Sequence, residues 1–251
     1  RMRAVILAAG RGSRMKHHTD DRPKGMVQLL GRSLVERMVD SLRLAGIHDI
    51  AIITGYRRES FDFMELPTFH NPDWAATNMV LSLTHAHEWL SRGPVIVCYS
   101  DIFVSPDHIR ALAADPHDFA LTYDVNWHDL WSARFEDVLS DAESFKIENG
   151  KILDIGRKCQ SLAEISGQYM GLFKTTPASW AKAREVLAAL PAAEQAKLSV
   201  TPLIQKMIAV GYPVHGVPVK GQWGEIDQEE DLRQYEYMIK RGVYGDWLRA
   251  A

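Results

Sequence analysis

Apolar runs and helical patterns alternate along the first half of the chain. Residues 4–7 are continuously apolar and end at a glycine-rich turn, which predicts a buried strand. In residues 34–45 apolar positions recur at helical spacing, behind a capping-box pattern formed by Ser33 and Glu36. Residues 50–54 predict a second strand. Strand, helix and strand in this order make a βαβ unit, so we expect a parallel sheet.

The same signals predict further elements in the rest of the chain. We expect Thr201 to cap one of the later helices, and Asp227 with Glu230 to cap the last. Residues 191–197 are Ala-rich and fit either a loop or continued helix. Helices are predicted over residues 78–90, 177–190, 202–210 and 228–241 and from Pro106 onward behind a Ser105 cap, and strands over residues 94–99, 119–123, 168–173 and 214–219.

An antiparallel hairpin interrupts this alternation. Residues 144–148 and 151–155 flank Asn149 and Gly150, a strong signal for a type I′ turn, and we place the pair at the edge of the sheet. The predicted fold class is therefore α/β. We expect a single Rossmann-like domain over residues 1–251, with a mostly parallel mixed sheet flanked by helices and a small antiparallel hairpin insertion.

Composition narrows the classes of protein that this chain can be. Its 251 residues are 46% hydrophobic and 24% charged, with a formal net charge of -3. Because a broad basic surface is missing, we expect no nucleic-acid partner. The two cysteines are too few for a disulfide framework. No apolar run approaches the roughly 20 residues that span a bilayer, so we expect a cytoplasmic protein with no membrane partner.

The turn after the first predicted strand is the first place to expect a ligand, because ligands of open parallel sheets bind at the carboxyl ends of strands. Small residues permit close backbone approach there, and Arg14 and Lys24 can neutralise phosphates. The alternative is an ordinary glycine turn with solvated charges. Two commoner phosphate motifs fail, since Met15 stands where a dinucleotide fingerprint needs glycine and Lys24 precedes Gly25 rather than Ser or Thr.

Two acids that follow predicted strands fit a magnesium site. Asp101 comes after the strand over residues 94–99, and Asp227 precedes the last predicted helix. Mg²⁺ is held by few carboxylates plus substrate phosphates, and it offsets the negative charge of the phosphate oxygens. Each acid also has a structural interpretation, as a turn residue or a helix cap. Together with the glycine-rich loop, the two acids favour the metal.

The strings LAAGRGSRM (residues 7–15) and RPKGMV (residues 22–27) resemble the signature of the sugar-phosphate nucleotidylyltransferase superfamily. Over nearly its full length, the chain is most similar to the CTP:phosphocholine (and phosphonate) cytidylyltransferase group. This resemblance implies a magnesium-dependent enzyme that transfers CMP from CTP to a small phosphorylated acceptor, with release of pyrophosphate. The acceptor would be phosphocholine, a phosphonate or a similar amine-bearing phosphate, and the pathway cell-surface polysaccharide biosynthesis.

The resemblance also assigns roles to individual residues. Lys24, Arg14, Asp101 and Asp227 are the expected catalytic residues, with the two acids as ligands of Mg²⁺. The sequence departs from many superfamily members at Ser100, where they have Gly before the metal-binding Asp, so the roles of the neighbouring pocket residues are less transferable. The residues expected to bind the nucleotide are Leu7, Ala8, Ala9, Gly10, Gly12, Ser13, Tyr56, Thr77, Asn78 and Ser100.

We expect an acceptor site around residues 124–175, which hold the insertion and edge strands. Aromatic and acidic side chains there could cage a quaternary ammonium by cation–π attraction or hold a primary amine by ion pairs. In the alternative interpretation the tryptophans only pack the insertion against the sheet, which we favour less for Trp223. The residues expected to bind the acceptor are Trp131, Glu143, Lys146, Gln168, Tyr169, Trp223 and Glu225.

The expected reaction is direct in-line attack by an acceptor oxygen on the α-phosphorus of CTP. Two rival functions stay open. One is a sugar-1-phosphate nucleotidylyltransferase using UTP, dTTP or GTP, and the other is a non-catalytic nucleotide-binding module. A homodimer is also left open. His17 and His18, in the polar loop before Arg22, are expected to face solvent rather than bind a metal.

Overall fold

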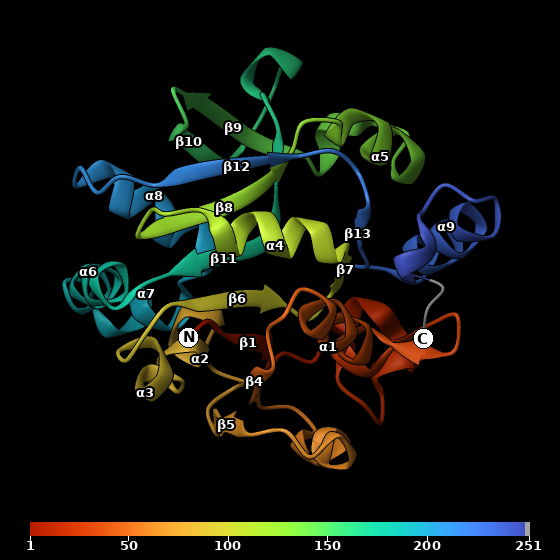
Figure 1. Cartoon of the computed structure of the whole chain (residues 1–251), viewed down its shortest axis with the longest axis horizontal. Helices are drawn as coiled ribbons and strands as arrows, with labels where there is room; N and C mark the ends of the chain where they lie inside the picture. Colours follow the sequence, from red (N-terminus) through yellow and green to blue (C-terminus); the bar gives the residue numbers. More distant parts are fainter. Residues whose placement is uncertain (249–251) are drawn as a thin grey trace.

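A nine-stranded mixed sheet forms the centre of the computed structural model, which describes residues 1–248 (Figure 1). The strand order is β5-β4-β1-β6-β11-β8-β12-β10-β9. Strands β5, β4, β1 and β6 run parallel to one another, whereas β11 runs antiparallel to both of its neighbours. The α/β class with a mostly parallel mixed sheet is thus confirmed. The strands are β1 (Arg3–Ala8), β4 (Asp49–Thr54), β5 (Thr68–His70), β6 (Val95–Tyr99), β8 (Phe119–Asp124), β9 (Glu143–Glu148), β10 (Lys151–Lys158), β11 (Gln168–Thr175) and β12 (His215–Val219).

Helices cover both faces of this sheet. Alternate residues of β1 point to opposite faces, so that Ile6 packs with α1 and α4 and Leu7 packs with α2, α6 and α8. The α-helices are α1 (Leu34–Leu44), α2 (Met79–Thr84), α3 (His87–Leu90), α4 (Pro106–Ala114), α5 (Trp127–Arg134), α6 (Pro177–Ala188), α7 (Ala192–Lys197), α8 (Val200–Ala209) and α9 (Glu229–Lys240). Short 3₁₀ helices are η1 (Ser13–Thr19), η2 (Lys24–Met26), η3 (Arg58–Met64), η4 (Val138–Ser140), η5 (Leu162–Glu164) and η6 (Asp246–Leu248).

Two short antiparallel pairs lie outside the main sheet. Strand β2 (Gln28–Leu29) pairs with β3 (Arg32–Ser33), and β7 (Ile102–Val104) pairs with β13 (Trp223–Glu225). The second pair matters for the site, because Asp101 precedes β7 and Asp227 follows β13. It is extended by the backbone N–H of Ile226, which donates to the carbonyl of Asp101 at 2.8 Å. None of these two- and three-residue strands was expected from the sequence.

The predicted hairpin and the capping box of α1 are confirmed. Asn149 and Gly150 have φ of 51° and 78°, as a type I′ turn requires, and β10 extends the sheet by pairing with β12. The Oγ of Ser33 accepts the N–H of Glu36 at 3.1 Å, and the Glu36 carboxylate accepts the N–H of Ser33 in return.

Two helix predictions need correction. The helix predicted over residues 78–90 is two helices, because Ala86 leaves helical geometry (φ -94°, ψ 16°) between α2 and α3. Helix α8 begins at Val200 behind Ser199, whose backbone is extended, so Thr201 lies inside the helix and does not cap it. The Ala-rich residues 192–197 form α7.

The cap of α9 also differs from the prediction. Gln228 is the N-cap and forms a capping box with Asp231, rather than Asp227 with Glu230. Asp231 takes this role because its carboxylate accepts the backbone N–H groups of both Asp227 and Gln228, at 2.9 and 3.1 Å. The side chain of Asp227 points instead toward Lys24. Within residues 1–248, no helix has the length and apolar character needed to cross a bilayer.

Candidate active site

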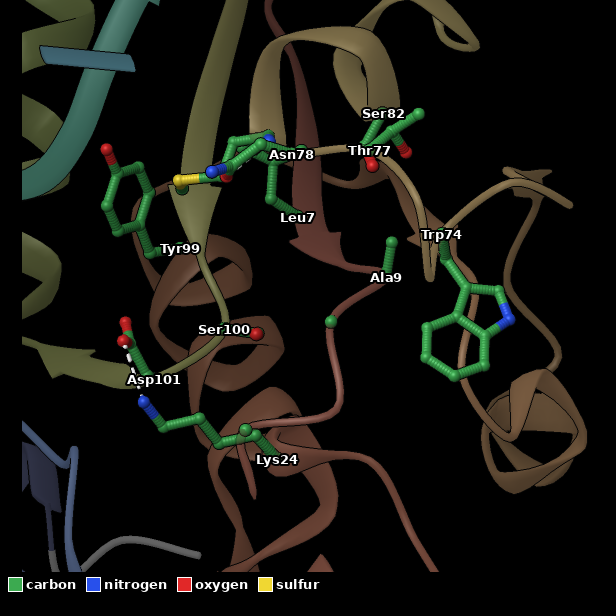
Figure 2. Close-up of a pocket in the computed structure, with 13 residues that line it drawn as sticks. Leu7, Ala9, Lys24, Trp74, Thr77, Asn78, Ser82, Tyr99, Ser100 and Asp101 are labelled. Atoms are coloured by element: carbon green, nitrogen blue, oxygen red, sulfur yellow. Dashed lines mark hydrogen bonds and ion pairs between the residues drawn. The ribbon is translucent and has the colours of Figure 1, made fainter. Parts of the chain in front are cut away.

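Lys24 lies between Asp101 and Asp227 and contacts both. Its Nζ donates to Asp101 Oδ2 and to Asp227 Oδ1, each at 3.1 Å, and Figure 2 shows the first of these contacts. Arg14 reaches the same Asp227 oxygen at 3.5 Å from a largely exposed position. The structure therefore brings the four expected catalytic residues together at one place. That convergence depends on segments that are 77 and 203 positions apart in the sequence.

The loop after β1 fixes the position of Lys24. Gly12 has a φ of 71°, in the left-handed region that glycine adopts most easily. A Cβ atom at this position would lie 2.7 Å from the Cβ of Lys24, well inside van der Waals contact. Gly12 is therefore required both for its backbone conformation and for the close approach of the Lys24 side chain.

Electrostatic coupling dominates this cluster. Burial opposes the charge of Lys24, but the carboxylates of Asp101 and Asp227 outweigh burial and raise its pKa. Burial also opposes the charge of Asp227, yet Lys24, together with Arg134, holds the pKa of that carboxyl below its usual range. Burial, followed by repulsion from Asp227 and Asp101, raises the pKa of Glu225 well above its ordinary value. The cluster is therefore rich in carboxylates that a further cation would stabilise.

The carboxylates also fit a divalent cation. Asp101, Glu225 and Asp227 each offer an oxygen, and these three atoms lie within 4.8 Å of one another. The second oxygen of Asp101, Oδ1, is buried and has no hydrogen-bond partner among the described residues. A buried carboxylate oxygen without a partner is costly, and an oxygen-only set of ligands suits Mg²⁺.

Arg134 holds the carboxylate of Asp227 from the other side. Its side chain is fully buried and makes a two-pronged contact with Asp231, at 3.1 Å from Nε and 2.9 Å from Nη2. The same Nη2 lies 3.4 Å from Asp227 Oδ2, and Nη1 lies 3.6 Å from Glu225. Because α5 supplies Arg134, this helix of the predicted insertion helps to position the acids.

A first cavity, of about 180 Å³, opens between the loop after β1 and the start of α2. In Figure 2, Lys24 and Asp101 lie at one end of this cavity, with Asn78 and Thr77 at the other. Backbone and small side chains form much of its wall. The lining residues are Leu7, Ala9, Gly10, Gly12, Lys24, Trp74, Thr77, Asn78, Met79, Ser82, Tyr99, Ser100 and Asp101.

A second cavity, of about 280 Å³, has Asp227 and Glu225 in its wall, whereas Asp101 lies in the wall of the first. It shares Met79 and Tyr99 with the first cavity, so the two adjoin. Its wall combines carboxylates with aromatic rings and hydroxyl groups. The lining residues are Arg14, Met79, Tyr99, Ile102, Trp131, Asp141, Glu143, Gln168, Tyr169, Met170, Gly171, Ser199, Val200, Thr201, Glu225 and Asp227.

Most of the residues expected at the nucleotide line the first cavity. Ser13, whose side chain lies outside the described part of the structure, is left aside, and two of the others are exceptions. Ala8 is buried in the sheet. The Tyr56 hydroxyl donates to the carbonyls of Thr19 and Asp20, and its ring packs edge-to-face on Trp74, with centroids 5.2 Å apart. Tyr56 therefore supports the cavity wall without forming it. The expected residues that line the cavity are Leu7, Ala9, Gly10, Gly12, Thr77, Asn78 and Ser100.

Five of the residues expected at the acceptor line the second cavity, and two do not. Lys146 donates to the carbonyl of Ala163 and lies outside both cavities. Trp223 is buried, donates from Nε1 to Asp124 at 2.8 Å and packs against Trp131. For Trp223 the structure thus agrees with the packing interpretation. The five residues that line the cavity are Trp131, Glu143, Gln168, Tyr169 and Glu225.

Sequence reasoning missed other residues of both cavities. Trp74 and Ser82 line the first cavity from the turn before α2 and from α2 itself, where only Thr77 and Asn78 had been expected. Ser199 and Thr201 line the second cavity from the start of α8. Trp74 stands three positions before Thr77 in the sequence, and its nearness to an expected nucleotide-binding residue could have indicated a place at this cavity. For the residues of α8 there was none, because only the fold brings this helix to the cavity.

These features together define a class of protein. A mostly parallel sheet carries a glycine-rich, cationic loop at the carboxyl end of β1, and this loop faces an acidic cluster between two cavities, which is the arrangement of a nucleotidyltransferase. The sequence matches the MobA-like NTP transferase domain over residues 4–202. The chain therefore belongs to this family of nucleotidyltransferases.

Comparison with individual proteins agrees with this assignment. The chain is 31% identical to a protein of Campylobacter jejuni named CTP:phosphoglutamine cytidylyltransferase, over 92% of this chain and 98% of that protein. The fold matches the CTP:phosphocholine cytidylyltransferase of Streptococcus pneumoniae with a TM-score of 0.71 and 21% identity, over 95% of this chain and 99% of that one. It also matches the inositol-1-phosphate CTP transferase of T. maritima, with a TM-score of 0.74 and 19% identity over 97% and 98% of the two chains.

Proposed function

We propose that this protein is a magnesium-dependent cytidylyltransferase, which transfers CMP from CTP to a small phosphorylated acceptor that carries a cationic amine. The observation that carries this proposal is the position of Lys24, Asp101 and Asp227 at the junction of two adjoining cavities. A triphosphate and an acceptor phosphate, one in each cavity, would meet at this cluster. No covalent intermediate is then required.

The first cavity suits the nucleotide. Backbone amides near Gly10 and Gly12 can donate to phosphate oxygens, with Lys24 as a counter-charge in the same wall. Arg14 adds a second positive charge from the wall of the adjoining cavity, beside Asp227. Trp74 offers a flat apolar face on which a base can stack. The base preference rests on the relatives, because the three proteins compared above are all named for the use of CTP.

Asp101 and Asp227, with Glu225 beside them, would hold Mg²⁺. When bound there, the ion would neutralise charge on the phosphate oxygens of the nucleotide and of the departing pyrophosphate. Lys24 would stay close to both acids and to the triphosphate, so that its ammonium stabilises the charge that develops as the bond to pyrophosphate breaks. Arg134 would keep the carboxylate of Asp227 oriented toward the phosphates.

The second cavity suits a cationic acceptor. Desolvation, followed by the charge of Asp227, raises the pKa of Asp141, and desolvation followed by the charge of Asp141 raises the pKa of Glu143. An ammonium group between these carboxylates would relieve their repulsion. Trp131 and Tyr169 add aromatic surface to the same wall. A hexose 1-phosphate carries no cationic group and would leave these carboxylates uncompensated, which argues against the sugar-1-phosphate alternative.

The proposed reaction is a single displacement at phosphorus. An anionic oxygen of the acceptor's phosphate or phosphonate attacks the α-phosphorus of CTP, forming a new phosphorus–oxygen bond. The bond between the α-phosphorus and the oxygen that bridges to the β-phosphorus breaks, and pyrophosphate leaves with that electron pair. Because the acceptor oxygen is already ionised near neutral pH, catalysis rests on positioning and charge stabilisation.

A pyrophosphate-release screen tests this proposal. The four nucleoside triphosphates are each combined, in excess Mg²⁺, with phosphocholine, phosphoethanolamine, aminoethylphosphonate, phosphorylated amino acids and hexose 1-phosphates. We expect turnover with CTP and at least one amine-bearing acceptor. Turnover confined to hexose 1-phosphates with UTP, dTTP or GTP would establish the sugar-nucleotide alternative. Tight CTP binding without pyrophosphate from any acceptor would indicate a non-catalytic module.

A further inference from the structure

Two histidines beside the phosphate loop lie close to a carboxylate of α9. His17, His18 and Glu229 each offer one ligand atom, and these three atoms lie within 4.8 Å of one another. The sequence placed both histidines in a polar loop facing solvent. His17 is exposed, but His18 is half-buried against the start of α9, so that expectation is wrong for His18.

The local backbone explains why neighbouring histidines share one direction. Lys16 has a φ of 55° and a ψ of -126°, which interrupts the 3₁₀ helix η1 just before His17. The two imidazole rings lie 4.2 Å apart at 31°, rather than on opposite sides of the chain. The Nε2 atom of His18 is buried and makes no hydrogen bond within the described part of the chain, although Glu229 Oε1 is 3.5 Å away. Buried polar atoms normally have a partner, so a bound ligand could supply the one that this ring nitrogen lacks.

The donor chemistry differs from that of the oxygen cluster described above. Two imidazole nitrogens with one carboxylate are typical ligands of Zn²⁺ and related transition metals, with water completing the coordination. Mg²⁺ prefers oxygen ligands and a near-octahedral shell, so it suits Asp101, Glu225 and Asp227 better. The protein thus offers two groups of ligands with different metal preferences.

We propose that His17, His18 and Glu229 form a binding site for a divalent transition metal ion of the zinc type, separate from the magnesium site. Such an ion would tie η1, which carries Arg14, to the first turn of α9, which begins two positions after Asp227. Occupation would therefore restrain the loop that approaches the triphosphate. The proposal does not depend on the identity of the acceptor or on catalysis.

Metal titration of the tag-free protein tests this site in the absence of CTP and in excess Mg²⁺. We expect one equivalent of Zn²⁺ to bind in calorimetry, and Co²⁺ to give the visible absorption bands of a low-symmetry site with nitrogen ligands. His18→Ala and Glu229→Gln should each weaken Zn²⁺ binding by about tenfold or more. His48→Ala, which alters an exposed histidine elsewhere, serves as the matched control and should bind Zn²⁺ like the original protein.

Circular dichroism shows whether each variant is folded before its Zn²⁺ affinity is compared. Glu229→Gln conserves side-chain size and is expected to fold normally. The proposal is overturned if the original protein binds no Zn²⁺ under these conditions. It is equally overturned if both folded variants keep full Zn²⁺ affinity, or if Asp101→Asn abolishes binding, because the ion would then occupy the oxygen cluster.

Discussion

At the scale of single residues, Lys24 connects the phosphate loop to both acids of the candidate site. The sequence string RPKGMV already indicated a phosphate-binding lysine. The family resemblance placed Lys24 with Asp101 and Asp227 in one catalytic site, and the structure brings the three residues together. The direct contacts of Lys24 with both acids had no local signal, because the two acids meet through the pairing of β7 with β13. Motif spacing thus identifies the chemical groups, whereas tertiary contacts decide which of them share one site.

Gly12→Ala should impair nucleotide binding through Lys24. The added methyl group would lie 2.7 Å from the Lys24 side chain, at a residue with positive φ. We expect a loss of about 1 kcal/mol in the free energy of unfolding from the backbone strain, together with a clear loss of CTP affinity. Gly31→Ala is the matched control, because Gly31 also has positive φ but a Cβ there meets nothing within 4 Å.

Urea unfolding and CTP titration of both glycine variants separate the two effects. Both variants should lose stability from backbone strain, with a larger loss for Gly12→Ala because its methyl group also meets Lys24, and only Gly12→Ala should bind CTP weakly. Equal CTP affinity in the two variants would show that the close approach of Gly12 to Lys24 has no role in binding.

At the scale of secondary-structure elements, α5 departs most from what periodicity could predict. No helix was predicted over residues 127–134, and the tryptophans there were open to either a binding or a packing interpretation. The two tryptophans differ in the structure. Trp131 lines the second cavity, whereas Trp127 is buried and lines neither the first nor the second cavity. Arg134, at the end of the same helix, contacts Asp231 and Asp227. A fully buried arginine on a short helix finds its partners only through the fold, so its role had no signature in the sequence.

Arg134→Gln should be strongly destabilising. Removing the guanidinium leaves Asp231 and Asp227 without their buried partner, and breaking a buried ion pair in this way costs about 3 kcal/mol or more. Urea unfolding measures the loss. Arg233→Gln is the control, because Arg233 pairs with Glu230 at an exposed position on α9 and should change stability by less than about 1 kcal/mol. Similar losses in both variants would contradict the structural role assigned to Arg134.

At the scale of the whole molecule, the fold places two adjoining cavities at one acidic cluster, with Asp101 in the wall of the first and Asp227 and Glu225 in the wall of the second. The mostly parallel sheet, the hairpin and the phosphate loop followed from hydrophobic periodicity and turn residues, which are local signals. The second cavity did not, because its wall combines α5, the hairpin region, β11 and the start of α8. Lys146 illustrates the limit, since a lysine on a predicted edge strand looked suited to an acceptor phosphate but contacts Ala163 instead.

Variants in the two cavities should affect different substrates. Trp74→Ala removes a surface on which a base can stack, so we expect the KM for CTP to rise by roughly tenfold with little change for the acceptor. Glu143→Gln removes a carboxylate from the second cavity, so the KM for an amine-bearing acceptor should rise by roughly tenfold with little change for CTP. Steady-state kinetics with each substrate varied in turn gives both values. The assignment of the cavities fails if the two effects are exchanged.

In the proposed reaction, an acceptor phosphate displaces pyrophosphate from CTP at the cluster of Lys24, Asp101 and Asp227. The most direct measurement is ³¹P NMR of CTP, Mg²⁺ and the best acceptor with the protein and with Asp101→Asn. We predict inorganic pyrophosphate and a CDP-linked product in equal amounts with the original protein, and neither product with the folded variant. Release of CDP and orthophosphate, or unchanged turnover by Asp101→Asn, would contradict this account.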